Sequence, residues 1–359
     1  MKALSVIVPS YDMEKSLPDC LGSLVVSPDL MDKLEVLVVN DGSTDRTGEI
    51  AHGFALRYPR TFKVIDKPNG HYGSCVNRGL GEATGVFVKI LDADDRFYAD
   101  SLASFLAALD GICASDRARP DLILSDYDVV DVGHRVLSHR TCRYESDGDL
   151  PLSGALSSLI LVPMHAVTYR TGLLREIGYR QTEGILYTDN EWTTYPLPYA
   201  RTFRYLPLNL YAYTVGREGQ SVATDVVLKN GTMLVEVAAR LCEAAGDGRI
   251  PEACRTFYRA VLERFAPSPY VACLREARLS EVNERLSALD SFTAGRSGAL
   301  YDLVGEISFP RRNGFRYVHA WRKHRRLGLP AILLLRLIFT LSPKLCRILA
   351  PLRKKEACR

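Results

Sequence analysis

The segment at residues 88–95 reads VKILDADD, an apolar run that ends in acidic residues. Its three carboxylates, Asp92, Asp94 and Asp95, fall within four residues. The run predicts a buried strand that delivers these groups to one edge of a sheet, where carboxylates need a cation or a hydrogen-bond donor. On an extended chain Asp92 and Asp94 point to the same side, and the small Ala93 points away. The segment therefore predicts a site for Mg²⁺ or Mn²⁺ shared with a phosphate group.

Four apolar runs rich in β-branched residues organise the beginning of the chain. They cover residues 3–8, 34–40, 62–66 and 85–91. Segments with helical spacing lie between them, at residues 17–26, 44–58 and 73–83, and the second has a start signal at Ser43 and Thr44. This alternation predicts an α/β fold with a mostly parallel central sheet flanked by helices.

Polar and turn-forming residues follow each of the four apolar runs. These expected strand exits are residues 9–12, 40–43, 66–70 and 92–95. In parallel sheets covered by helices, ligands bind outside the carboxyl ends of the strands. The four exits are therefore expected to converge on one pocket.

The pattern changes in the second half of the chain. Residues 122–125 and 129–137 are predicted to be further strands, and residues 151–215 alternate short helical and extended pieces. Beyond Ser221 the spacing is helical, through residues 226–245, 251–266 and 276–289. A helical C-terminal region over residues 221–310 is therefore expected.

The charge of the chain is unevenly distributed. Residues 311–359 carry 14 Lys or Arg and one acid, a net charge of +13, whereas the whole chain of 359 residues carries +4. The remainder is an acidic body with a net charge of −9. Nine cysteines without a close pair indicate reduced thiols, and the N-terminus shows no cleavable signal pattern. A cytoplasmic location is therefore expected.

The basic tail, residues 311–359, contains an apolar stretch at residues 329–341 that is interrupted by Arg336. A bilayer-spanning helix needs about 20 apolar residues, so this stretch is too short to span. One interpretation is an amphipathic tail on the inner face of the cell membrane, where its basic flanks meet anionic headgroups. The alternatives are a helix docked on the protein's own core and an oligomer interface. Nucleic-acid binding is not expected, because no base-stacking or groove-reading motif accompanies the charge.

Three motifs near the strand exits resemble those of the family 2 glycosyltransferases, whose catalytic domain has the GT-A fold. They are VIVPSYD at residues 6–12, VVNDGSTD at residues 38–45 and LDADD at residues 91–95. The resemblance continues through KPNGHYGSCVNRG at residues 67–79 and covers about the first 220 residues. It implies a catalytic domain over residues 1–220, with a donor half at residues 1–110 and an acceptor half at residues 111–220.

This resemblance implies that the first two motifs hold the nucleotide of a sugar donor, usually a uridine diphosphate sugar. Pro9, Tyr11 and Asp41 would line the nucleoside pocket, and Asp94 together with Asp92 would hold the metal. At a strand end, Asp41 can accept a hydrogen bond from a uracil N–H or a ribose hydroxyl. The alternative for Asp41 is a helix-capping turn leading into Thr44.

The loop and helix at residues 67–79 provide further donor-site candidates. Lys67 and Arg78 could neutralise donor phosphates, and Gly70 and Gly73 bracket a turn at an expected helix N-terminus, where anions are favoured. The remaining donor-binding residues that the resemblance implies are Asp12, Gly42, Asn77 and Ala93.

The expected catalytic base lies in YTDNEW at residues 187–192, which resembles the acid motif of the family. Asp189 matches the second acid, the base, whereas Thr188 stands where glutamate is common, so Glu191 is the alternative base. A later segment at residues 213–221 resembles the family's diphosphate region and makes Arg217 a donor-binding candidate. His165 is predicted either to face the acceptor pocket or to be a buried structural histidine.

Together these features imply an inverting transfer of a sugar from a nucleotide diphosphate sugar to a glycan or lipid-linked hydroxyl acceptor, in cell-surface polysaccharide or glycolipid synthesis. A non-catalytic module that only binds nucleotide sugars or glycans is the alternative, but such a module would be expected to lack the acid motif or the metal pair. A nucleotidyltransferase is a second alternative, and its glycine-rich activation loop does not follow the first apolar run.

Overall fold

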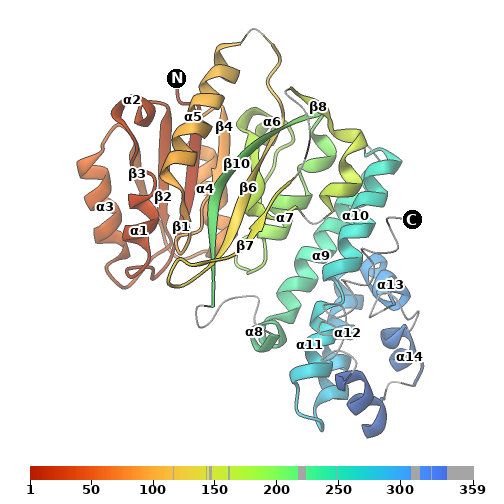
Figure 1. Ribbon diagram of the computed structural model, residues 1–359. Coiled ribbons are helices and arrows are strands. Elements are labelled where there is room, and N and C mark those ends of the chain that lie inside the picture. Colours follow the sequence, from red (N-terminus) through yellow and green to blue (C-terminus); the bar gives the residue numbers. More distant parts are fainter. Residues whose placement is uncertain are drawn as a thin grey trace. The chain divides into compact units, whose positions relative to one another are not determined.

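The computed structural model describes residues 1–115, 117–142, 144, 148–160, 162–216, 224–248, 250–308, 316–324 and 326–337. The chain divides into two compact units, Met1–Glu218 and Gly219–Arg359. The first unit is a sheet covered by helices, and the described part of the second unit is helical (Figure 1).

A ten-stranded sheet forms the centre of the described part of the first unit, in the order β3-β2-β1-β4-β9-β6-β10-β5, with β7 paired to β6 and β8 paired to β10. The strands are β1 (Leu4–Ser10), β2 (Leu34–Asn40), β3 (Phe62–Asp66), β4 (Phe87–Ile90), β5 (Arg96–Phe97), β6 (Leu122–Asp131), β7 (Val136–Arg140), β8 (Leu150–Pro151), β9 (Val167–Arg170) and β10 (Thr202–Val215). The pairs β1–β2, β1–β4 and β2–β3 are parallel, and β9 is antiparallel to β4 and β6. The predicted α/β fold with a mostly parallel sheet is confirmed.

Helices cover both faces of this sheet, which explains why every residue of β1 and of β4 is buried. The helices of the first unit are α1 (Leu17–Gly22), α2 (Pro28–Met31), α3 (Thr47–Arg57), α4 (His71–Glu82), α5 (Ala99–Ala114), α6 (Thr171–Glu176) and α7 (Asp189–Thr194). Leu4, Val6 and Val8 of β1 join a core cluster with residues of α1 and α5. Ile7, on the opposite face, lies against Gly79 of α4.

Helix α3 begins at Thr47 rather than at the predicted Ser43–Thr44 start. The reason is Asp45, whose carboxylate accepts hydrogen bonds from the backbone N–H groups of Thr47 at 2.9 Å and Glu14 at 3.0 Å. These bonds hold the preceding residues in a loop that joins the exits of β1 and β2.

Strand β6 is continuous over Leu122–Asp131, whereas the sequence predicted two separate strands at 122–125 and 129–137. The intervening acids are accommodated because both find donors: Asp126 accepts from Tyr205 Oη at 2.8 Å, and Asp128 accepts from Tyr98 Oη at 2.8 Å. A turn then separates β6 from β7, which pairs antiparallel with it.

The described part of the second unit consists of helices, so the predicted helical C-terminal extension is confirmed. They are α8 (Thr224–Lys229), α9 (Gly231–Ala245), α10 (Glu252–Phe265), α11 (Ser268–Glu276), α12 (Val282–Arg296), α13 (Gly298–Glu306) and α14 (Tyr317–His324). Buried aromatic residues, among them Tyr270, Tyr317 and Trp321, pack between them. Within this core Asp290 pairs with Arg322 at 2.7 Å. Arg322 belongs to the basic segment before the apolar stretch, which was predicted to meet anionic headgroups. Its ion pair with Asp290 instead holds it within the core of the second unit.

Residues 329–337 form a further helical segment of the second unit. Ile332 and Leu335 are buried, and Arg336 Nε donates to the carbonyl of Leu274 at 2.7 Å. One face of this segment therefore docks on the unit's own helices. The other face exposes four leucines, Leu329, Leu333, Leu334 and Leu337, each about half exposed. Among the described residues no helix is both long and apolar enough to cross a membrane, and residues 338–359 of the predicted tail lie outside the described part.

Candidate active site

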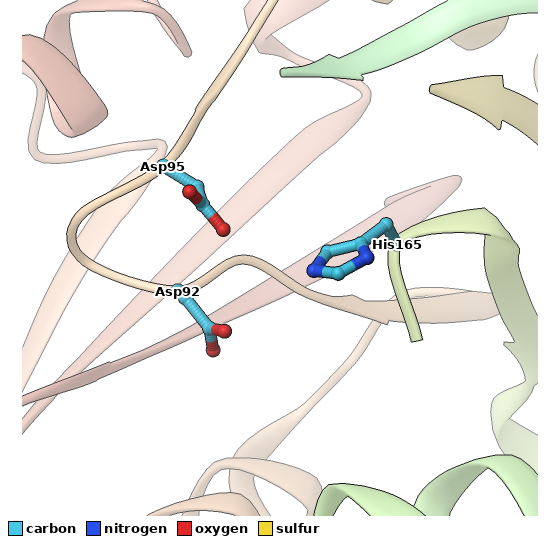
Figure 2. A group of neighbouring side chains, drawn as sticks. All are labelled: Asp92, Asp95 and His165. Atoms are coloured by element: carbon cyan, nitrogen blue, oxygen red, sulfur yellow. The ribbon is translucent and has the colours of Figure 1, made fainter. Parts of the chain in front are cut away.

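The acidic residues that follow β4 form a turn rather than an extended segment. The backbone N–H of Asp95 donates to the carbonyl of Asp92 at 3.0 Å. The expectation that Asp92 and Asp94 point to one side of an extended strand is therefore wrong. The turn instead brings Asp92 and Asp95 together with His165, and ligand atoms of these three residues lie within 4.8 Å of one another (Figure 2). Asp94 is not a member of this group.

Three hydrogen bonds hold the two grouped carboxylates. Asp95 accepts from Tyr211 Oη at 2.7 Å and from the backbone N–H of Thr214 at 2.7 Å, both on β10. Tyr72, on α4, donates its hydroxyl to Asp92 at 2.8 Å. Burial raises the pKa of Asp95 well above its ordinary value, and the charges of Asp92 and Asp94 raise it further. A bound cation would remove this repulsion, since an opposite charge favours the ionised form.

Asp189 begins helix α7 and lies near the same acidic turn. Burial raises the pKa of Tyr213 to about 12, and the charges of Asp95, Asp92, Asp94 and Asp189 add to this rise. The pKa of Tyr72 is also well above its ordinary value, through burial first and then through the charges of Asp92, Asp189 and Asp95. The charges of the candidate metal-site carboxylates and of the candidate base therefore raise the pKa of the same two tyrosines.

Glu191, the alternative base, is fully buried and lies two residues beyond Asp189. Its carboxylate accepts from the backbone N–H of Thr182 at 2.8 Å and from Thr182 Oγ1 at 2.6 Å. Both carboxylate oxygens are thus engaged in fixing the loop before α7. Asp189, by contrast, is only partly buried, and burial raises its pKa. Of the two carboxylates, Asp189 is therefore the more exposed one.

Asp41 lies at the exit of β2 and is buried. Its Oδ1 pairs with Lys67 Nζ and accepts from the backbone N–H of Gly70 at 3.0 Å. The Lys67 ammonium group therefore compensates the charge of the buried Asp41 carboxylate. Gly42 follows with a φ of +74°, a backbone conformation that glycine adopts without steric cost.

The exit of β1 is tied to the exit of β2. Asp12 accepts from the backbone N–H of Thr44 at 2.8 Å, and the N–H of Asp12 donates to Ser43 Oγ at 3.1 Å. Pro9 is buried in β1, whereas the ring of Tyr11 is about half exposed at 47%. The side chains of Tyr11 and Asp12 are both exposed, and Asp12 braces the two loops.

Helix α4 carries two predicted donor residues with different surroundings. Asn77 donates to the carbonyl of Gln181 at 2.9 Å, and its Oδ1 accepts from the N–H of Gln181 at 2.8 Å, so it clasps the loop that precedes α7. Arg78 lies on the exposed side and pairs with Glu82 at 3.1 Å. Glu82 also pairs with Lys63 near the start of β3, so the structure does not bring Arg78 to the carboxylates.

Two further predicted residues complete the placement. Ala93 packs in the core cluster and is 2% exposed. Arg217 lies outside the described residues.

Comparison with known proteins shows which families and folds this chain is similar to. Residues 5–116 match the model described as "Glycosyl transferase family 2". Over these residues the chain is similar to glycosyltransferase family 2. Among curated relatives, the uncharacterized glycosyltransferase YibD of Escherichia coli K12 is 30% identical over 217 residues, 58% of this chain and 60% of YibD. The uncharacterized glycosyltransferase MG025 homolog of Mycoplasma pneumoniae is 37% identical over 99 residues, 27% of this chain and 33% of the relative. The chain spans less than two thirds of either relative.

Solved structures agree on the fold. The crystal structure of S. aureus TarS 1–349 in complex with UDP-GlcNAc is similar with a TM-score of 0.66 and 21% identity, over 95% of this chain and 92% of that chain. The mannosyltransferase PcManGT of Pyrobaculum calidifontis, in complex with GDP-Man and Mn²⁺, is similar with a TM-score of 0.51 and 19% identity, over 93% of this chain and 86% of that chain. The GT-A fold predicted from the family 2 motifs is therefore confirmed.

Some residues around the acidic turn were not singled out from the sequence. Tyr72 lies in a quoted motif, but its hydroxyl contact with Asp92 depends on where α4 lies. Tyr211 is 116 residues from Asp95 along the chain, and no local pattern indicates the contact. Lys89, which donates to the carbonyl of His165, could have been singled out from the sequence, because a lysine within an apolar strand is unusual.

Proposed function

We propose that this protein is an inverting glycosyltransferase that moves a sugar from a nucleoside diphosphate sugar, first of all a UDP-sugar, to a hydroxyl acceptor. The observation that carries the proposal is the influence of Asp92, Asp95 and Asp189 on the same tyrosines, Tyr72 and Tyr213. Such a transfer requires an acidic metal site and a catalytic base in the same active site.

The nucleotide is proposed to lie over the exits of β1 and β2. Hydrogen bonds to Asp41 from Lys67 and Gly70 reach Oδ1, and Oδ2 is proposed to accept from the nucleoside. Tyr11 offers a half-exposed ring for stacking on a base. TarS binds UDP-GlcNAc and UDP in its solved structures, and PcManGT binds GDP-Man. We propose UDP as the nucleotide of the donor. The panel of nucleotide sugars described below identifies the sugar.

The metal is proposed to be Mn²⁺ or Mg²⁺. The carboxylates of Asp92 and Asp95 offer hard oxygen ligands, and their mutual repulsion fits a cation between them. When bound, such an ion stabilises the charge that develops on the departing diphosphate. Asp94, the first choice from the sequence, flanks the group and stays a predicted ligand.

In the proposed reaction Asp189 removes the proton from the acceptor hydroxyl. The acceptor oxygen attacks the anomeric carbon while the bond from that carbon to the diphosphate oxygen breaks. The proton ends on Asp189, the electron pair leaves with the nucleoside diphosphate, and the anomeric configuration inverts. Glu191 and Asn77 keep the loop before α7 on helix α4, which fixes the position of Asp189.

The acceptor is proposed to be a glycan or lipid-linked hydroxyl compound of cell-surface polysaccharide or glycolipid synthesis. A cavity of about 450 Å³ lies on the acceptor side, lined by residues that include Tyr127, Arg140, Tyr144 and Pro163. The Tyr127 ring lies 5.3 Å from that of His165, beside the metal site. We propose this cavity as the entry for the acceptor.

Product analysis tests the proposal. The protein is incubated with a panel of nucleotide sugars and glycan acceptors, with Mn²⁺ or Mg²⁺, and both the glycoside and the free nucleotide are quantified. A glycoside with free nucleoside diphosphate supports the proposal. Binding without turnover over the whole panel would instead favour the non-catalytic module, and pyrophosphate release a nucleotidyltransferase.

Asp41→Asn is expected to weaken UDP binding at least tenfold. A hydrogen bond to a charged group contributes about 1.5–3 kcal/mol, and about 1.4 kcal/mol is a factor of ten in affinity. Calorimetric titration with UDP measures the change. Asp66→Asn is the matched control, because Asp66 ends the neighbouring strand β3 and pairs with the exposed His52. Equal UDP affinities of both variants and the unmodified protein would remove Asp41 from the donor site.

A membrane surface is proposed as a partner, at the inner face of the cell membrane. The exposed face of residues 329–337 carries four leucines, and the basic residues Lys323 and Arg326 nearby are exposed. Leu333→Ser combined with Leu334→Ser is expected to lower cosedimentation with anionic liposomes several-fold. Leu56→Ser is the control, since Leu56 is 83% exposed on α3. Unchanged cosedimentation of the double variant would count against this partner.

A further inference from the structure

His165 has no part in the chemistry proposed above, although it is buried beside the carboxylates. It lies on the 3-10 helix η3 (Met164–Ala166) and is 9% exposed. Its Nδ1 is buried and has no hydrogen-bond partner among the described residues. Figure 2 shows the other ring nitrogen pointing toward Asp92 and Asp95. This second nitrogen lies where a ligand to a cation between the two carboxylates would lie, and neutral imidazole is a common metal ligand.

Aromatic contacts fix the orientation of this ring. His165 stacks on Tyr213 with ring centroids 4.1 Å apart, and Tyr211 meets it edge-on at 4.7 Å. Tyr211 Oη also donates to Asp95 and accepts from the backbone N–H of Asp92 at 3.2 Å. One tyrosine thus sets the positions of the histidine and of both acidic residues relative to one another.

Lys89 holds the backbone of His165 from within the sheet. Its ammonium group is fully buried and donates to the carbonyls of His165 at 2.7 Å and Val167 at 3.2 Å. A buried ammonium group is costly unless its protons are used. Lys89 precedes Asp92 by three residues, so the strand that delivers the carboxylates also holds the histidine in place.

We propose that His165 supplies a nitrogen ligand to the divalent cation that Asp92 and Asp95 hold, and that Lys89 is a positioning residue for it. The separation of up to 4.8 Å between the ligand atoms is close to twice the metal–ligand distance of about 2.1 Å. Burial lowers the pKa of His165 to about 3, so the ring is neutral and able to ligate. This inference rests on the proposed function, because the cation is the one expected on the donor diphosphate.

A nitrogen ligand has a consequence for metal choice. Mg²⁺ prefers oxygen ligands, whereas imidazole suits transition metals, and affinity rises from Mn²⁺ to Co²⁺ in the usual series. The site should therefore prefer Mn²⁺ and Co²⁺ over Mg²⁺. Removing the nitrogen should lower Mn²⁺ affinity more than Mg²⁺ affinity.

The test measures Mn²⁺ binding by the full chain in the presence of UDP. The EPR signal of free Mn²⁺ is the readout. His165→Phe keeps a flat ring for stacking on Tyr213 and is expected to weaken Mn²⁺ binding at least tenfold, with a smaller change for Mg²⁺ in competition. His52→Phe removes the nitrogens of an exposed histidine on α3 and is expected to leave Mn²⁺ binding unchanged. Lys89→Met is expected to weaken Mn²⁺ binding by a smaller factor than His165→Phe.

Pulsed EPR on the unmodified protein gives a reading that needs no variant. A directly bound imidazole should add a nitrogen coupling to the Mn²⁺ spectrum. Its absence, or Mn²⁺ affinity within twofold of the unmodified protein in a folded His165→Phe, would overturn the inference. Sugar transfer by the same unmodified preparation is measured separately, so a failure of the proposed function is distinguished from a failure of the ligand assignment.

Discussion

Asp189→Asn is expected to lower kcat for sugar transfer by about 10²–10⁴, the range that base assistance contributes. The amide keeps the size of the side chain but does not accept the acceptor's proton. UDP affinity should stay nearly unchanged, because the proposed partner of Asp189, at the start of α7, is the acceptor hydroxyl and not the nucleotide. Steady-state kinetics with the active nucleotide sugar, together with calorimetric titration of UDP, measure both quantities.

The same substitution is expected to stabilise the folded protein at neutral pH. Burial raises the pKa of Asp189 above its ordinary value, so the ionised side chain opposes folding. Its contribution to stability is fully present below the unfolded-state pKa and is lost as the pH rises through the folded-state pKa. Asp189→Asn should therefore raise Tm at pH 7, and the gain should shrink as the pH falls toward 4. In the unmodified enzyme kcat should fall as the pH drops through this raised pKa.

Glu191→Gln provides the comparison that decides between the two acids. Glu191 accepts two hydrogen bonds from Thr182 and is buried, so its replacement should lower Tm and reduce kcat less than Asp189→Asn does. Full activity of Asp189→Asn together with an inactive but folded Glu191→Gln would reverse the assignment of the base.

The central strands of the donor half could be predicted from the sequence because they are covered on both faces. Such strands read as continuous apolar runs, and the predicted run at 34–40 coincides with β2. The predicted run at 62–66 coincides with the edge strand β3, which is only partly buried. The strand exits also carried their polar residues in the expected order. Local pattern was sufficient here because each exit residue follows directly from the end of its strand.

The arrangement within the acidic turn could not be predicted from the same pattern. An extended chain pairs Asp92 with Asp94, but the hydrogen bond from Asp95 N–H to Asp92 closes a turn and pairs Asp92 with Asp95. Tyr211 and Thr214 hold Asp95 in this position from β10. These contacts join parts of the chain that are more than 100 residues apart, and sequence spacing carries no information on them.

Strand β6 was divided in the sequence interpretation for a related reason. Asp126 and Asp128 interrupt the apolar pattern, yet the strand continues because Tyr205 and Tyr98 donate to them. Polar residues are accepted in a buried strand when distant side chains satisfy them. The continuity of β6 therefore depends on contacts that are distant in the sequence.

Gly73→Ala is expected to lower both stability and transfer activity, because no room exists for a methyl group at this position of α4. A Cβ atom there would lie 2.0 Å from the carbonyl oxygen of Thr182. Thr182 cannot move away freely, since Glu191 holds its N–H and hydroxyl and Asn77 clasps the adjacent Gln181. We expect a loss of about 1–3 kcal/mol in the free energy of unfolding, as for other overpacked sites.

The activity loss follows from the position of the displaced loop, which leads directly into Asp189. If the loop positions the base, kcat should fall at least tenfold while UDP affinity changes little. Gly81→Ala is the matched control in the same helix, because a Cβ atom there meets nothing within 4 Å. It should stabilise the protein by up to about 1 kcal/mol, the helix-propensity difference between glycine and alanine. If Gly73→Ala had the same kcat and Tm as Gly81→Ala, the loop before α7 would not rest on α4. Asp189 would then be positioned by other contacts.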